Sequence, residues 1–175
     1  LLGLGGLGAL ALTGCGLGTG GGFTRSGALG GDLAAIDLDG LSLAVGSKNF
    51  SEQVLLGKMA VILLNSAGAQ VQDLTNIPGS ATARQAMLQD EVQMQWEYTG
   101  TAWIAYLGET TPIPDERKQY EAVRDRDLEE HQLVWLDPAP MNNTYGFAGP
   151  TETIKKLGIT KLSELAKVPE AELTF

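Results

Sequence analysis

The chain has 175 residues, a hydrophobic content of 43% and a formal net charge of −9. This hydrophobic content is enough to bury a core, which excludes a disordered chain. The excess of acidic over basic residues argues against a nucleic-acid partner, because phosphate backbones attract Lys and Arg. The single cysteine excludes an internal disulfide and a multi-cysteine metal site. We expect no metal and no cofactor, and we expect the one histidine, His131, to lie in solvent near a helix end.

The first 14 residues are only Leu, Gly, Ala and Thr. This apolar run is shorter than the roughly 20 residues that span a bilayer, but it suits the core of a signal peptide. Residues 12–15 (LTGC) resemble the lipobox of bacterial lipoproteins, in which cleavage leaves an acylated cysteine. We therefore predict a partial signal peptide over residues 1–15 and a lipid on Cys15, which anchors the protein at the outer face of the cell membrane or in the periplasm. The alternative is that Cys15 is simply a small apolar residue.

A glycine-rich segment follows this leader. Residues 16–31 contain eight glycines, with Ser and Thr among them. This composition is typical of a flexible tether. We assign residues 16–38 to a tether that holds a folded domain away from a membrane.

The first predicted strand covers residues 41–46, and a turn follows it over residues 47–50. A helix is predicted from Ser51 to about Ser66, because apolar residues recur there at helical spacing. Asn49 is expected to cap this helix and Gly68 to end it. The apolar residues expected on its buried face are Val54, Leu55, Met59, Ile62 and Leu63.

Two further strands are predicted over residues 71–77 and 92–96, with a helix over residues 81–89 between them. Residues 98–101 form the next turn, and residues 102–107 start another helix. Three strand–helix units in succession predict an α/β fold with a parallel sheet and right-handed crossovers.

Ligands of parallel α/β sheets bind beyond the carboxyl ends of the strands. The turns at residues 47–50 and 98–101 both follow predicted strands, so we expect them to share one rim of the sheet. The second turn contains a tyrosine, two hydroxyl side chains and a glycine, a combination suited to ligand recognition.

A charged helix is predicted over residues 115–130, where it covers the domain with a narrow apolar stripe. The stripe consists of Tyr120, Val123 and Leu128. Short strands are predicted over residues 133–136, 145–148 and 173–175. Short helices are predicted over residues 151–157 and 163–167.

Three motifs in this order resemble the substrate-binding proteins of osmoprotectant ABC importers, which bind glycine betaine, choline, carnitine or proline betaine. The motifs are residues 46–53 (GSKNFSEQ), 96–101 (WEYTGT) and 142–145 (NNTY). The resemblance covers about residues 40–175 and implies a periplasmic-binding-protein-like (type II) fold, in which two α/β lobes with mostly parallel sheets close on a ligand. It assigns residues 39–141 to the first lobe and residues 142–175 to a crossing segment and the start of an incomplete second lobe.

The resemblance also implies a ligand site. Tyr98 and Tyr145 are similar to two walls of an aromatic cage for a quaternary ammonium group, Lys48 and Thr101 to partners of a betaine carboxylate, and Asn143 to a main-chain contact. A trimethylammonium group donates no classical hydrogen bond, so ring faces, each worth about 0.5 to 2 kcal/mol, suit its recognition. A lysine beside a helix N-terminus suits the carboxylate. Taken without the resemblance, a solvated loop lysine and ordinary half-buried tyrosines remain open alternatives.

The sequence departs from the family pattern at Gln93 and Gln95, where an acid and an aromatic residue are common. The family chain also continues beyond the equivalent of residue 175, through an arginine-bearing segment and further cage aromatics. The resemblance therefore implies a C-terminally truncated chain that carries about half of a cage.

The leading hypothesis is a receptor, not an enzyme, that captures a quaternary-ammonium osmoprotectant outside the cytoplasm and delivers it to the permease subunits of an ABC importer. One alternative is a sensory or regulatory solute-binding domain with the same fold, and another is an inert truncated fragment. The sequence contains no nucleophile paired with a base, no phosphate-binding motif and no metal-ligand cluster, which argues against an enzyme.

Overall fold

The computed structural model describes residues 26–144 and 146–169. The predicted signal peptide with its lipidation site Cys15, and the predicted cage wall Tyr145, lie outside these ranges. The chain divides after Trp135 into two compact units, and each unit is described by itself. No helix within the described ranges is long and apolar enough to cross a membrane.

The first unit is built on a parallel pair of strands, β1 (Ser42–Lys48) and β2 (Gln70–Ile77). Both predicted strands are confirmed. However, β1 continues beyond its predicted end at Gly46, because Lys48 still pairs with Ile77. Lys48 therefore lies at the end of a buried strand rather than in a turn.

The predicted third strand, residues 92–96, runs parallel beside β1 but forms only one bridge, between Val45 and Met94. The Gly46 N–H donates to the Met94 carbonyl oxygen at 2.9 Å. A side chain replaces one backbone hydrogen bond between these segments, since the Ala44 N–H donates to Gln93 Oε1 at 2.7 Å. A regular third strand is therefore not formed.

Helix α1 (Ser51–Ser66) has the predicted bounds and packs very closely on the sheet. A Cβ atom added at Gly57 would lie 2.7 Å from Thr75 Cγ2 and 3.1 Å from Ser47 Cβ. A residue without a side chain is therefore required at position 57, where the helix meets the strands. The buried residues of α1 are Gln53, Gly57, Ala60 and Val61.

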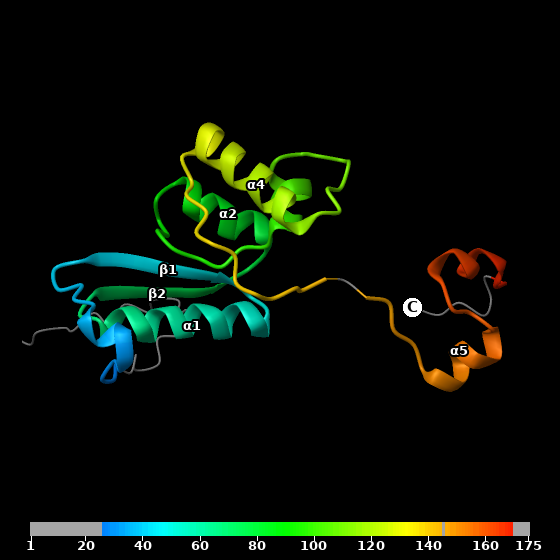
Figure 1. Cartoon of the computed structure of the whole chain (residues 1–175), viewed down its shortest axis with the longest axis horizontal. Helices are drawn as coiled ribbons and strands as arrows, with labels where there is room; N and C mark the ends of the chain where they lie inside the picture. The colour runs from blue at the N-terminus through cyan, green and yellow to red at the C-terminus, as the bar shows by residue number, and fades with distance from the viewer. Residues whose placement is uncertain (1–25, 145, 170–175) are drawn as a thin grey trace, which may run out of the picture. The chain divides into compact units, whose positions relative to one another are not determined.

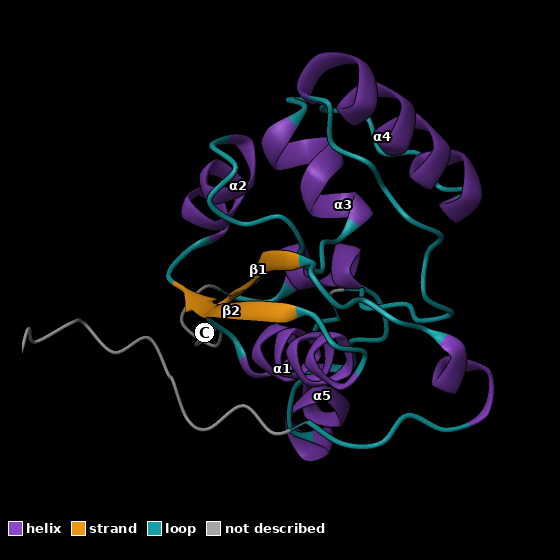
Figure 2. Ribbon diagram, turned by 90° about the vertical axis from the view of Figure 1, so that its left-hand side faces the viewer, coloured by secondary structure: helices purple, strands orange, loops and turns teal. Residues whose placement is uncertain are grey.

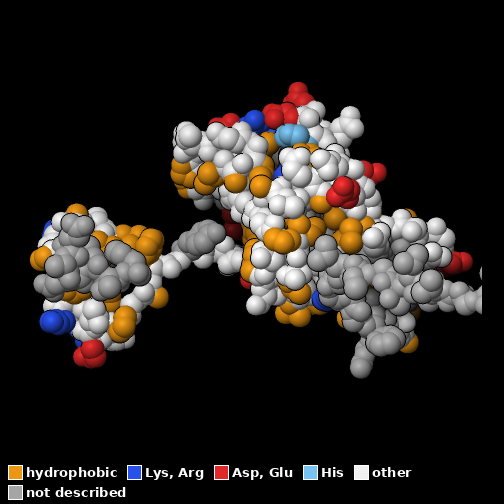
Figure 3. All heavy atoms as spheres, turned by 180° about the vertical axis from the view of Figure 1, so that it is seen from behind, with side chains coloured by type: hydrophobic (Ala, Val, Ile, Leu, Met, Phe, Trp, Pro, Cys, Tyr) orange, Lys and Arg blue, Asp and Glu red, His pale blue; other side chains and the backbone are white. Residues whose placement is uncertain are grey.

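The expectation that the large apolar residues of α1 face the core is wrong for four of them. Leu55, Met59, Ile62 and Leu63 are between 42% and 62% exposed. The close approach of the sheet at Gly57 places the face that carries Gly57 against the strands and turns these four side chains outward. Hydrophobic side chains are accordingly visible on the surface of this unit in Figure 3.

The two ends of α1 differ from each other in how well they were predicted. Asn49 does not cap the helix: Phe50 occupies the N-cap position without a side-chain cap bond, and Asn49 Oδ1 accepts from the Gly79 N–H at 3.4 Å. The predicted stop is confirmed, since Gly68 follows the helix with a φ of 102°, a conformation that glycine adopts without strain.

Residues before β1 lie against the carboxyl end of α1. They include a short 3-10 helix, η1 (Gly31–Ala35). The Gly27 N–H donates to Ser66 Oγ at 2.9 Å, and the Leu38 N–H donates to the Ala67 carbonyl oxygen at 2.7 Å. The described part of the predicted tether is thus attached to the first unit.

Helices cover both faces of the strands. Figures 1 and 2 show α1 on one face, and α2 (Ser80–Leu88) and α4 (Glu116–His131) on the other. Between them, α3 (Thr99–Thr101) continues directly into a π-helix, η2 (Ala102–Tyr106). The predicted turn at residues 98–101 is therefore largely the first turn of a helix.

Helix α4 is close to its prediction. The Asp115 side chain caps it by accepting from the Lys118 N–H at 2.9 Å. Tyr120 and Val123 are buried as expected, but Leu128 is 53% exposed, and Asp127 occupies the buried position next to it. An apolar cluster joins α4 to the preceding helix through Ala102, Leu107 and Val123.

The second unit contains two short helices, α5 (Thr151–Leu157) and the 3-10 helix η3 (Leu162–Lys167), which confirm the predicted helices. Glu164 stabilises the start of η3 by accepting from the Thr160 N–H at 2.7 Å. Neither residues 133–136 nor residues 146–148 form the predicted strands, since no strand among the described residues pairs with them. The predicted strand at residues 173–175 lies outside the described ranges.

Candidate functional site

The two segments that were expected to share a rim do meet at the carboxyl end of β1. Lys48 is only 2% exposed, and its Nζ donates to Glu97 Oε1 at 2.5 Å. The same Nζ lies 5.3 Å from the centre of the Tyr98 ring. The expected proximity of Lys48 and Tyr98 is therefore confirmed, and Glu97 lies between their elements as a counter-ion.

Three donors hold the Glu97 carboxylate. Oε1 accepts from Lys48 Nζ and from the backbone N–H of Tyr98, at 2.5 and 2.8 Å. Oε2 accepts from the hydroxyl of Tyr106 at 3.1 Å. Since only 10% of the Glu97 side chain is exposed, these bonds compensate the cost of burying its charge.

Tyr98 is fixed by α1 as well as by Glu97. Its hydroxyl donates to a carboxylate oxygen of Glu52, in the first turn of α1. Its ring stacks on Phe50, with centroids 6.0 Å apart and an interplanar angle of 26°. Thr101 is half-buried and ends α3, one helical turn after Tyr98. The ring of Tyr98 is thus held by the Glu52 carboxylate and by Phe50, while Glu97 holds the Tyr98 backbone N–H.

Tyr106 is a site residue that sequence reasoning missed. Its ring centre lies 5.7 Å from Lys48 Nζ, so the ammonium lies over two tyrosine rings. Burial, and then the charge of Glu97, raises the pKa of Tyr106 well above its usual value and keeps the hydroxyl protonated as a donor. The available signal was spacing, because eight residues are about two helical turns and place Tyr106 on the same helix face as Tyr98.

A second buried cluster contacts the Tyr106 ring. The guanidinium carbon of Arg84 lies 5.0 Å from the Tyr106 ring centre. Both terminal nitrogens of Arg84 donate to the two carboxylate oxygens of Asp127, one of them at 3.0 Å. Trp135 Nε1 also donates to Asp127, at 2.7 Å. The cluster connects α2 and α4 to the wall formed by Tyr106.

The groups around Asp127 favour the ionised form of its carboxyl. Burial alone would raise the pKa of the Asp127 carboxyl, but hydrogen bonds from Arg84 and Trp135 outweigh burial and lower that pKa below its ordinary value. His131 ends α4 as expected, yet it is not fully solvated: its ring is 28% exposed, and its Nδ1 lies 3.1 Å from Asp127. The expectation of a simple solvent-exposed histidine is wrong, because Asp127 and Arg84 lie beside its ring.

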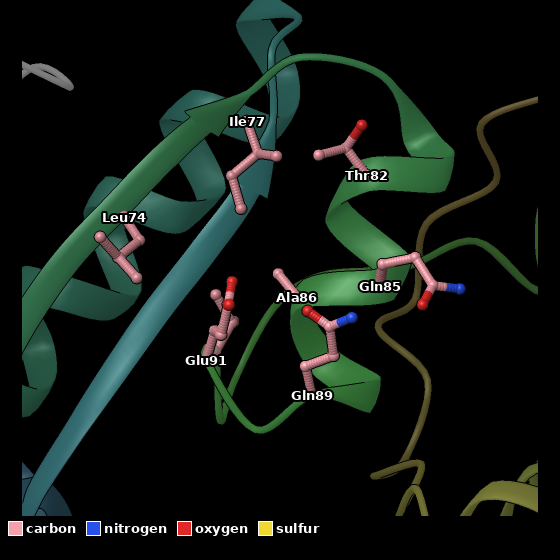
Figure 4. Close-up of a pocket in the computed structure, with 8 residues that line it drawn as sticks. Leu74, Ile77, Thr82, Gln85, Ala86, Gln89 and Glu91 are labelled. Carbon is pink, nitrogen blue, oxygen red and sulfur yellow. The ribbon is translucent and has the colours of Figure 1, made fainter. Parts of the chain in front are cut away.

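The structure also has a cavity of about 240 Å³ between β2 and α2 (Figure 4). The side chains of Leu74, Ile77 and Ala86 face it, and the amides of Gln85 and Gln89 lie at its edge. None of the predicted ligand-binding residues lines this cavity. The candidate site is therefore the Lys48–Tyr98 region, not the cavity.

The other predicted site residues belong to the second unit. Asn143 is exposed, and Tyr145 lies outside the described ranges. Their roles stay predictions. In the part of the chain that the structure describes, no group of His, Cys, Asp or Glu side chains could hold a metal ion.

Comparisons with known proteins agree with the motifs. The family model "Substrate binding domain of ABC-type glycine betaine transport system" matches residues 42–175. A glycine-betaine-binding protein of Pseudomonas aeruginosa is 37% identical over 127 residues, which are 73% of this chain and 40% of that protein. The glycine betaine-binding protein YehZ of Escherichia coli is 31% identical over 147 residues, 82% of this chain and 48% of YehZ.

Solved structures give the same result for the fold. Ligand-free YehZ of Escherichia coli has a TM-score of 0.57 and 30% identity, over 72% of this chain and 45% of YehZ. A glycine betaine/carnitine/choline ABC transporter structure has a TM-score of 0.54 at 21% identity, over 72% of this chain and 47% of that one. The chain spans less than half the length of these relatives.

The fold is thus of the periplasmic-binding-protein-like class, with the α/β organisation and parallel strands that the sequence predicted. The chain belongs to the family of substrate-binding domains of ABC-type glycine betaine transport systems. Members of this family are transport proteins, not enzymes, which confirms the expectation that the chain is not an enzyme.

Proposed function

We propose that the protein is the extracytoplasmic substrate-binding component of an ABC importer and captures a quaternary-ammonium osmoprotectant of the glycine betaine or choline type. The observation that carries this proposal is the meeting of Lys48 and Tyr98 at the carboxyl end of β1, in a chain of this family. Relatives named as binders of glycine betaine and of carnitine support the ligand class.

The ammonium head of the ligand is bound by ring faces in this proposal. Tyr98 and Tyr145 are two walls of the cage, each contributing about 0.5 to 2 kcal/mol of cation–π attraction. The stacking of Tyr98 on Phe50 and its bond to Glu52 support the role, because they hold the ring in place before a ligand arrives.

The carboxylate of a betaine is bound by donors near the start of α3. Lys48 supplies a positive charge, Thr101 a hydroxyl, and the first turn of the helix oriented backbone N–H groups. Asn143 adds a main-chain contact from the crossing segment. The location of Lys48 at the end of a buried strand supports this assignment, since it fixes the start of the lysine side chain.

The partners follow from the family. The protein delivers its ligand to ABC permease subunits, and closure of two lobes on the ligand is the signal. In this proposal residues 39–141 belong to the first lobe and residues 142–175 to the crossing segment and second lobe. A lipid on Cys15, after a signal peptide at residues 1–15, holds the protein at the membrane through the tether at residues 16–38.

A sensory or regulatory role is the second candidate. It is favoured by one relative, the chemotactic signal transduction system substrate-binding protein CosB of Halobacterium salinarum, which is 33% identical over 71% of this chain and 38% of CosB. Uptake of labelled ligand by cells that carry the protein with its permease separates the two roles. A purely sensory protein binds the ligand without supporting uptake.

Isothermal titration of the folded chain with glycine betaine and with choline tests the proposal. We expect binding heat with at least one of them, and none with 3,3-dimethylbutanol, which has the shape of choline without its charge. A chain that is folded by circular dichroism yet gives no heat with either ligand would contradict a binding function. Rapid proteolysis throughout the chain would favour the inert-fragment alternative.

A further inference from the structure

The Lys48–Glu97 pair combines a positively charged nitrogen with a carboxylate, as a betaine does, although the Lys48 ammonium differs from a trimethylammonium group in having N–H donors. Its ammonium lies over the rings of Tyr98 and Tyr106, and its carboxylate is held by a backbone N–H and a phenol hydroxyl. The protein therefore already provides Lys48 with a carboxylate partner of its own. A ligand carboxylate that approaches this ammonium must share it with Glu97.

The charge around Tyr98 also acts against a second carboxylate. Glu97 neutralises Lys48, and the Glu52 carboxylate accepts from the Tyr98 hydroxyl. Arg84, whose guanidinium lies over the Tyr106 ring, is paired with Asp127, so these two groups add no net charge. The three charged groups shown in contact with Tyr98, which are Lys48, Glu97 and Glu52, sum to one negative charge, which attracts a cation and repels a carboxylate.

We propose that Glu97 is a specificity-determining residue. By pairing with Lys48 it weakens the attraction of that ammonium for a ligand carboxylate. It thereby sets the ratio between the affinities for betaines and for quaternary-ammonium ligands without a carboxylate, such as choline. This inference rests on the proposed function, because it requires that both ligand types bind beside Lys48 and Tyr98.

Replacement of Glu97 by glutamine is the direct test. Glu97→Gln has nearly the same shape and keeps an acceptor oxygen for Lys48, but it removes the negative charge. We expect the affinity ratio of glycine betaine to choline, measured by isothermal titration of the 175-residue chain, to rise at least about fivefold in the variant. The matched control Glu121→Gln removes a charge from an exposed ion pair with Arg117, and the ratio should stay at its wild-type value.

The possible results separate this inference from the function on which it rests. If folded Glu97→Gln binds both ligands with the wild-type ratio of affinities, the role of Glu97 is overturned and the proposed function still stands. A folded wild-type chain that binds neither ligand overturns both. If Glu97→Gln does not fold, Glu97→Asp tests the role instead, because its shorter side chain draws the carboxylate away from Lys48. A betaine-to-choline affinity ratio shifted in the same direction supports the role of Glu97, and an unchanged ratio overturns it.

Discussion

Arg84 of α2 and Asp127 of α4 form a buried, two-pronged ion pair, in which Asp127 is fully buried and Arg84 is 6% exposed. The pair joins two helices on the same face of the sheet, and the Arg84 guanidinium carbon lies 5.0 Å from the centre of the Tyr106 ring. Because a buried charge without its partner is costly, the integrity of the first unit depends on this contact.

Asp127→Asn should therefore strongly destabilise the protein. It leaves the Arg84 guanidinium buried without a counter-ion, which costs about 3 to 5 kcal/mol of unfolding free energy. Urea denaturation followed by circular dichroism measures the effect. Asp125→Asn is a matched control on the same helix, since it removes an exposed partner of Arg124 and should cost less than about 1 kcal/mol. Equal losses in the two variants would contradict the importance of the buried pair.

The lowered pKa of Asp127 predicts a pH dependence of stability. A carboxyl whose pKa is lower in the folded state than its ordinary value of 3.8 stabilises the fold fully above that value and loses the contribution as pH falls through the folded-state pKa. The unfolding free energy of the wild type should therefore fall more steeply below about pH 4 than that of Asp127→Asn. Parallel pH profiles of the two proteins would show that Asp127 titrates alike in both states.

Tyr98 should be needed for its ring more than for its hydroxyl. Tyr98→Ala removes a wall of the proposed cage and should weaken quaternary-ammonium binding at least about tenfold, or about 1.4 kcal/mol. Tyr98→Phe keeps the ring and the stacking on Phe50 but loses the bond to Glu52, and should bind within a few-fold of the wild type. Isothermal titration measures both, and an unchanged affinity in Tyr98→Ala would remove Tyr98 from the site.

The two faces of α1 should respond differently to truncation. Val61 is 1% exposed, so Val61→Ala opens space in the core and should cost about 1 to 3 kcal/mol. Leu63 is 47% exposed, and Leu63→Ala should cost less than about 1 kcal/mol although it removes a larger side chain. Chemical denaturation of both variants tests which face is buried. A larger loss in Leu63→Ala would favour the orientation expected from the sequence.

Gly57 should not tolerate a larger residue. Gly57→Ala places a methyl group 2.7 Å from Thr75 Cγ2, so the helix must move away from the sheet. Overpacking of this kind costs about 1 to 3 kcal/mol and should exceed the gain in helix propensity. Gly100→Ala is the control, since its nearest described neighbour would be Gln119 Nε2 at 3.7 Å. A more stable Gly57→Ala variant would show that α1 has room to shift.

Local sequence patterns predicted where helices and strands begin and end better than they predicted which of their side chains are buried. The bounds of α1 follow from turn residues and apolar spacing, and the structure reproduces them. The buried face does not follow from apolar spacing, because it depends on how closely the sheet approaches Gly57. That distance is set by residues far along the chain, such as Thr75, so the sequence of the helix alone cannot supply it.

The same limit applies to the site. The strand-to-helix pattern was sufficient to bring Lys48 and Tyr98 to one rim. It gave no means of assigning Glu97 as the partner of Lys48, because many acidic residues were available and their side-chain directions were unknown. Tyr106 was missed because its contact with Lys48 depends on the continuous course of α3 and η2.

The bond between Lys48 and Glu97 joins residues 49 positions apart, and the bond between Tyr98 and Glu52 joins residues 46 positions apart. Both bonds therefore close long loops that contain β2 and α2. The entropic cost of closing these loops is offset only when most of the other contacts of the first unit have formed. Contacts of such high sequence separation cost loop-closure entropy before they stabilise the fold, so we expect both bonds to form late in folding. In a chain leaving the ribosome, the Lys48–Tyr98 contacts would therefore form only after α2 has been synthesised and docked. We likewise expect that ligand added during refolding accelerates no early step and acts only by slowing unfolding.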